Sequence, residues 1–149
     1  MEPIDGPVRV PEGGWPRALQ RMDLLPGIKL DVAIYEIAGA SRRLHRGVVA
    51  DFIGVPLVAF PHQTTDEVAA TYGRLREAMY AFDREGVPER WSSARKAWIC
   101  AGVMSGATSP AEIDERFGIG SDELAEWLKR FSTFGLPGLS ARPKIAAVR

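Results

Sequence analysis

Residues 90–139 read RWSSARKAWICAGVMSGATSPAEIDERFGIGSDELAEWLKRFSTFGLPGL, which contains three short helical patterns with turns between them. The first pattern predicts a helix over residues 93–105. The second begins at Ser109, where a serine can cap the free backbone amides of a helix. Pro110 suits the first helical position, and Glu112 can reach back to complete a capping box. We therefore predict that a second helix starts at Ser109.

A glycine-bearing turn separates the second pattern from the third. Gly118 and Gly120 permit backbone angles that other residues resist, as a tight turn between helices requires. Ser121 is expected to cap the third helix, whose buried stripe is predicted to be Leu124, Trp127, Leu128 and Phe131. Gly135 ends this pattern. Helix, short turn and helix in this order predict a helix-turn-helix.

The same stretch carries a family pattern without a gap. Its positions are Arg90-Trp91, Arg95-Lys96-Ala97, Gly106, Ser109, Ala111-Glu112, Arg116-Phe117, Ser121, Glu123, Trp127 and Gly135-Leu136-Pro137-Gly138-Leu139. The stretch resembles the alphaproteobacterial family of SciP, the inhibitor of the cell-cycle regulator CtrA. That resemblance implies a bacterial transcription regulator with a tri-helical DNA-binding domain that also contacts another regulator or RNA polymerase. Transposase-type helix-turn-helix domains are a more distant resemblance, since they share the Gly-Leu-x-Gly-Leu ending.

The composition is that of a globular protein, but its charge is unevenly distributed. Of the 149 residues 46% are hydrophobic and 26% are charged, and 19 basic side chains balance 19 acidic ones. Residues 1–89 hold 10 Lys or Arg against 13 Asp or Glu, whereas residues 90–149 hold 9 against 6. The resulting balance of +3 favours a polyanion as the partner of the C-terminal part. We expect a cytoplasmic protein without membrane contact, because we find one cysteine, no signal sequence and no apolar run of membrane-spanning length.

The first 89 residues predict a small α+β region. Its expected elements are a short helix over residues 15–22, a strand over 28–37, a turn at 39–41, and strands over 47–53 and 55–60. The strands would form a hairpin or meander too small to be stable alone, so they must pack on something else. The fold class that we predict is α+β, with an N-terminal region at residues 1–89, a helix-turn-helix domain at 90–139 and a basic tail at 140–149.

An amphipathic helix is predicted over residues 65–84. It begins with a capping box at Thr64–Glu67, and its apolar stripe is Val68, Tyr72, Leu75, Met79 and Phe82. Two uses of this stripe stay open. It can cover the N-terminal strands, or it can pair two copies of the chain as a homodimer through helix 65–84.

Two functions stay open for the third helix of the C-terminal stretch. If it enters double-stranded DNA, its base-reading candidates are Ser121, Asp122, Glu126, Lys129 and Arg130, and the phosphate candidates are Arg95, Lys96, Arg116, Arg142 and Lys144. Asp122, Glu123 and Glu126 would however be repelled by phosphates. Ala94 and Met104 also stand where the family has arginines, which reduces the basic footprint. The alternative is therefore a protein-docking module whose acidic helix binds a basic partner.

Residues for catalysis, cofactors or metals are sparse. The chain has no glycine-rich phosphate loop, nucleophile elbow or metal-binding His/Cys pair, so we expect neither an enzyme nor a cofactor or metal site. Cys100 lies on an apolar helix face and is interpreted as a buried, inert thiol. Arg42 and Arg46 have the spacing of cyclic-dinucleotide sites of the PilZ type, but the residues that follow differ. We interpret this cluster as a solvated turn or an extra phosphate contact.

Overall fold

The computed structural model describes residues 15–140, which form a small sheet and five α-helices. The elements are β1 (Gln20–Arg21), α1 (Leu30–Leu44), β2 (Val48–Phe52), β3 (Val55–Ala59), α2 (Thr65–Glu85), α3 (Ser93–Ser105), α4 (Pro110–Phe117), α5 (Ser121–Phe134) and a short 3-10 helix, η1 (Leu136–Leu139). The chain is thus of mixed α+β class, as the sequence predicts.

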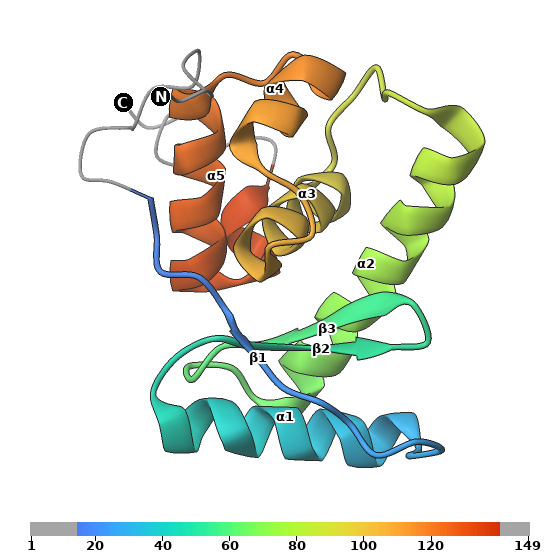
Figure 1. Cartoon of the computed structure of the whole chain (residues 1–149), viewed down its shortest axis with the longest axis vertical. Helices are drawn as coiled ribbons and strands as arrows, with labels where there is room; N and C mark the ends of the chain where they lie inside the picture. The colour runs from blue at the N-terminus through green and yellow to red at the C-terminus, as the bar shows by residue number, and fades with distance from the viewer. Residues whose placement is uncertain (1–14, 141–149) are drawn as a thin grey trace, which may run out of the picture.

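The sheet lies between two layers of helices (Figure 1). α1 covers one face of the sheet, and α3, α4 and α5 lie beyond the other. α2 runs along one side and contacts α1, β3 and α3, so it joins the two layers. In the sheet the strand order is β1-β2-β3, with β1 parallel and β3 antiparallel to β2. The buried hydrophobic side chains form one cluster that extends from Leu19 to Leu139.

The strand predicted over residues 28–37 is wrong, because this segment begins α1. The turn predicted at residues 39–41 is wrong for the same reason, since α1 continues to Leu44. The β-branched run suggested a strand, but the residues buried against the sheet and α2 recur with helical spacing: Ala33, Ile34, Ile37, Ala38, Ala40 and Ser41. Asp31 in the first turn and two arginines in the last also favour the helix dipole. Burial with helical periodicity outweighs β propensity here.

The short helix predicted over residues 15–22 is also wrong. The chain is extended there, and its backbone amides bond to distant elements instead of to one another. Leu19 N donates to Met104 O (3.0 Å), Gln20 N to Gly47 O (2.9 Å) and Met22 N to Val49 O (3.0 Å). These bonds make β1 an edge strand of the sheet and tie it to the end of α3.

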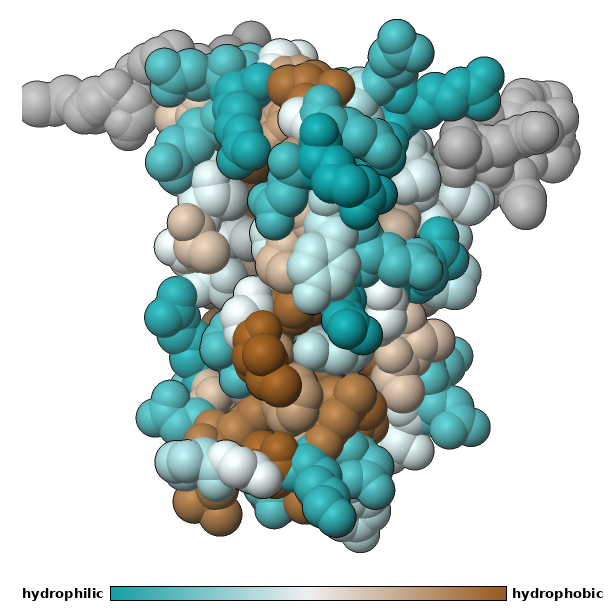
Figure 2. Space-filling model, turned by 90° about the vertical axis from the view of Figure 1, so that its right-hand side faces the viewer, coloured by the Kyte–Doolittle hydropathy of each residue, from teal (hydrophilic) through white to brown (hydrophobic). Residues whose placement is uncertain are grey.

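The strands expected over residues 47–53 and 55–60 are present as β2 and β3. Ile53 and Gly54 form the two-residue turn between them, with φ of 51° and 80°. Two positive φ angles are those of a type I′ turn, which favours Asn-Gly, and a β-branched residue is unusual there. Ile53 is also 82% exposed. Figure 2 shows the side of the molecule on which hydrophobic side chains gather over the lower part, by the sheet and α1.

The conformation of this turn gives a stability prediction. Ile53→Asn should raise the free energy of unfolding by about 1 kcal/mol, because asparagine tolerates the left-handed region and the exposed isoleucine loses little packing. Gly54→Ala should lower it by about the same amount, because alanine at φ 80° is strained. Urea denaturation of both variants measures the two shifts. Equal destabilisation by both would show that Ile53 is required by packing.

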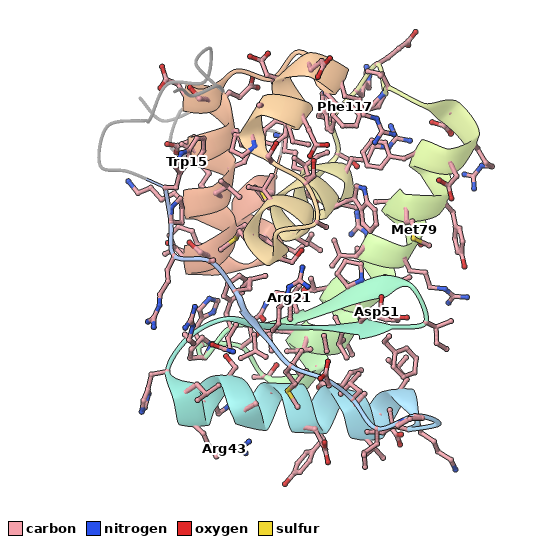
Figure 3. The ribbon with its side chains drawn as sticks, in the orientation of Figure 1. Trp15, Arg21, Arg43, Asp51, Met79 and Phe117 are labelled. Atoms are coloured by element: carbon pink, nitrogen blue, oxygen red, sulfur yellow. The ribbon has the colours of Figure 1, made fainter. Side chains whose placement is uncertain are left out.

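The capping box expected at the start of α2 is present, and the apolar stripe of α2 packs against other parts of the same chain. Thr64 Oγ1 accepts from Glu67 N (3.1 Å), and Glu67 Oε1 accepts from Thr64 N (2.8 Å). Of the stripe, Val68, Tyr72, Leu75 and Phe82 are buried, and only Met79 is half-buried (Figure 3). The Tyr72 hydroxyl donates to Phe52 O (3.1 Å), and burial raises the pKa of this hydroxyl. The stripe therefore covers the strands, which leaves little of it for a second copy.

Candidate nucleic-acid interface

α4 is held at its start by its own side chains. Ser109 Oγ accepts from Glu112 N (3.2 Å), and Glu112 Oε1 accepts from Ser109 N (3.1 Å), so the predicted capping box is present. Thr108 Oγ1 donates to the same carboxylate oxygen (3.0 Å). Glu112 is thus committed to the helix start and is not a free charge for a ligand.

The turn between α4 and α5 has three residues, Gly118, Ile119 and Gly120. Gly118 ends α4 with φ 72°, a left-handed angle that glycine accepts without strain. Ile119 is buried and anchors the turn to the core. The prediction that Ser121 caps α5 is wrong, because Gly120 is the N-cap and Ser121 is the first helical residue. No side chain caps the first amides of α5.

η1 packs tightly against the last turns of α5. A Cβ built on Gly138 would lie 2.6 Å from Arg130 O and 2.9 Å from Phe134 Cβ, so only glycine fits at this position. Gly135 has φ 74°, and Leu139 is 1% exposed. The Gly-Leu-x-Gly-Leu ending is therefore a packing device that holds α5 in place. It does not itself supply a binding group.

Four aromatic rings join the tops of the helices. Trp91 lies 5.4 Å from Trp127, 5.5 Å from Phe117 and 5.9 Å from Phe82, measured between ring centroids. Phe117 lies in the upper part of the molecule, beside the end of α4 (Figure 3). These rings join α2, α4 and α5. The predicted burial of Trp127 is confirmed, and the half-buried Trp91 packs against the same core.

Three of the predicted phosphate or base contacts already have partners in the chain. Arg95 Nη2 pairs with Glu85 Oε1 of α2 at 2.9 Å. Lys96 Nζ lies 5.4 Å from the centroid of the Trp127 ring, and Arg130 Nε pairs with Glu126 Oε2 at 2.8 Å. Exposed pairs of this kind are worth less than about 1 kcal/mol, so DNA could still compete for these cations. In the structure, however, these three cations make contacts within and between the helices α2, α3 and α5.

The outer face of α5 gathers the other predicted residues. Asp122, Glu126 and Lys129 are exposed and Ser121 is half-buried. Arg116 lies in the last turn of α4, with its guanidinium 4.8 Å from the Phe117 ring centroid. Arg142 and Lys144 lie outside the described residues. Residues 110–134 carry six acids against three bases, a balance of −3. The segment that contains α4 and α5 is therefore more acidic than the whole C-terminal part.

Trp98 is a feature that sequence reasoning did not single out. It lines a hollow of about 380 Å³ between α3 and the sheet, together with Arg21 and Asp51. Figure 3 labels Arg21 and Asp51 beside the sheet. It also lines a second hollow of about 380 Å³ between α3 and α4. Arg21 donates from Nη2 to Ser105 O (2.7 Å), which fixes β1 at the end of α3. The available signal was that Trp98 lies off the buried stripe of α3.

Cys100 is fully buried in α3, as expected of an inert thiol. Burial raises the pKa of this thiol far above its usual range, although the Lys96 ammonium opposes the shift. The thiol therefore stays protonated at neutral pH. Within residues 15–140, no group of three His, Cys, Asp or Glu side chains is placed to hold a metal ion. None of the described helices has the length and apolar character needed to cross a bilayer.

Burial of the single cysteine gives a direct test of the core. In the native protein Cys100 should react with a disulfide reagent at least about a thousandfold more slowly than in the unfolded chain, because reaction requires opening of the core. The absorbance of the released thiolate measures both rates, and the chain in guanidinium is the control. Rapid reaction in the native state would contradict the packing of α3.

Comparison with known proteins gives one match. Residues 64–145 match the sequence profile of the family described as Protein of unknown function (DUF1153). The match covers more than half of the chain and extends from the start of α2 beyond η1. The chain matches none of the curated proteins and none of the solved structures.

Proposed function

The chain belongs to the family of proteins of unknown function DUF1153, and we propose that it is a bacterial transcription regulator that contacts double-stranded DNA. In this proposal α4, the turn and α5 act as a helix-turn-helix, and α5 enters the major groove. The protein acts in the cytoplasm without catalysis or a cofactor. The resemblance of residues 90–139 to the SciP family supports this function and adds another regulator or RNA polymerase as a protein partner.

The observation that carries the proposal is the outer face of α5, which residues 15–140 leave exposed. Its buried stripe is fixed against α3 and η1, while Asp122, Glu126 and Lys129 face outward. α5 has 14 residues and is roughly 20 Å long. Its diameter with side chains, about 10–12 Å, matches the width of the major groove, about 12 Å. Within residues 15–140 no side chain caps the first amides of α5, unlike those of α4, and free amides at a helix start suit a phosphate oxygen.

The second candidate function is protein docking, and the acidity of the same face favours it. Among the described residues Asp122 and Glu123 form no ion pair, and both lie in the first turn of α5. Two carboxylates at this position weaken an approach to phosphates. A basic surface of a partner protein would meet them favourably. The two candidates therefore differ in the expected effect of these carboxylates.

Removal of two cations tests the DNA proposal. Arg116→Ala with Lys129→Ala should weaken DNA binding and reduce the slope of log K against log salt by about 2, because each lost phosphate contact removes one released counterion. Binding of pooled genomic DNA fragments across a salt series measures the slope. The matched control is Arg74→Ala with Arg84→Ala, which removes two exposed cations from α2. Equal losses in both variants would exclude a specific role of α5.

Neutralisation of the two first-turn carboxylates separates the candidates. Asp122→Asn with Glu123→Gln should strengthen DNA binding roughly tenfold, because two repulsive charges are removed at unchanged shape. The docking function instead requires that this variant lose affinity for a polylysine probe while DNA binding stays undetectable. Fluorescence anisotropy with labelled DNA and labelled polylysine measures both affinities.

A further inference from the structure

The outward face of α1 is left exposed by the described part of the chain and lies far from α4 and α5. α1 forms the lower edge of the molecule in Figure 1, with the sheet above it. Tyr35 on this face is 73% exposed and Val32 is 44% exposed. Arg43 points away from the sheet in Figure 3. This face lies outside residues 64–145, so membership of the family does not account for it.

Gly39 lies at the centre of this exposed face. Glycine in the interior of a helix makes the helix less stable than alanine does. It is useful there when another backbone must approach closely. Gly39 is not among the glycines with positive φ, and a Cβ added to it would meet only Arg43 Nη1, at an ordinary 3.5 Å. Nothing in the described chain therefore requires glycine at this position.

The charges of the face are arranged symmetrically about Gly39. Glu36 and Arg43 lie seven residues apart, which is nearly two turns, so they share one flank of the helix. Tyr35 and Arg42 have the same spacing on the other flank. Glu36 and Arg43 form no ion pair with any residue between 15 and 140. A second α1 that ran in the opposite direction would place its Arg43 opposite Glu36, and its Arg42 opposite Tyr35.

We propose that two copies of the chain form a symmetric dimer in which their α1 helices pack antiparallel and cross at Gly39. The same surface serves in both copies, as two-fold symmetry requires. Each dimer gains two Glu36–Arg43 ion pairs and two contacts between an arginine and a tyrosine ring.

A hollow on the face fits this arrangement. It measures about 360 Å³ and is lined by Met22, Tyr35, Glu36, Gly39, Arg42 and Arg43. The ring of Tyr35 from the second copy enters it beside Arg42, on the flank of Gly39 that lies opposite Arg43. Arg42 donates from Nη2 to Gln63 O (3.1 Å), which holds its guanidinium at the edge of the hollow. The dimer thus uses side chains that the fold already positions.

The dimer leaves the proposed DNA-binding faces free. α1 and the group of α4 and α5 lie on opposite sides of the sheet (Figure 1). A 15-residue helix spans roughly 22 Å, so the interface is at the small end for protein complexes. We expect a dissociation constant of the order of 10 µM, which rises with salt as the ion pairs are screened.

Sedimentation equilibrium of the full chain, from about 1 to 200 µM, tests the dimer around this dissociation constant. Gly39→Leu should abolish dimerisation, since the side chain blocks the crossing point, while the melting temperature stays equal or rises by about 3 °C. Gly73→Leu is the matched control, because Gly73 is an exposed helical glycine of α2 with nothing within 4 Å of an added Cβ. This control should dimerise like the native chain. A native chain that is monomeric throughout the range would overturn the proposal.

Charge exchange tests the antiparallel arrangement. Glu36→Arg alone and Arg43→Glu alone should each be monomeric, because like charges then face each other twice in every dimer. An equimolar mixture of these two variants should form a heterodimer of near-native affinity, since both opposed pairs are again complementary. Dimers of either single variant, or a mixture that stays monomeric, would show that another surface or another orientation is used.

Discussion

The contact between Phe60 and Phe131 joins the sheet to the layer of helices that contains α5. Phe60 follows β3 and Phe131 belongs to α5, and their rings meet edge to face with centroids 5.2 Å apart. Gln63 fixes the loop beside them, since its buried Oε1 accepts from Phe60 N at 2.9 Å. Gly47 leaves room for the ring, because an added Cβ would lie 2.8 Å from Phe60. Aromatic pairs of this kind add about 1 kcal/mol beyond the area that they bury.

The packing of helices on the sheet, which includes the Phe60–Phe131 contact, explains how a small sheet is stable in this chain. Three short strands cannot hold together alone, and one of them, β1, has only two residues. α1 covers one face of the sheet, and α2 and α3 contact β3. The Phe60–Phe131 contact adds a link between the sheet and α5 within the one core cluster, which extends from Leu19 to Leu139. Residues that precede the family match thus take part in the same core as the matched residues.

Signals within a few consecutive residues predict the C-terminal helices. The N-terminal part is harder to predict, because its structure depends on contacts between residues far apart in the sequence. The capping boxes at Thr64 and Ser109 need only four consecutive residues, so the sequence shows them directly. β1 depends on amides that meet Gly47 and Met104, which no local pattern reveals. α1 was mistaken for a strand because its β-branched residues gave a local signal opposite to that of its buried positions. In both cases tertiary contacts decided the local structure.

The sequence predicts which residues form the candidate site better than it predicts the charge that this site presents. Helical periodicity predicts which residues of α5 face outward, since Leu124 and Phe131 must turn inward. The four-residue spacing of Glu126 and Arg130 on one helix is that of an ion pair. Periodicity does not show that Arg95 pairs with Glu85 of α2, because this pair depends on how two helices pack. A cation that already has a partner is a weaker ligand for phosphate than a net charge count implies. The charge that a face offers to DNA is therefore set by packing, and the +3 balance of the C-terminal sequence overestimates it for this helix pair.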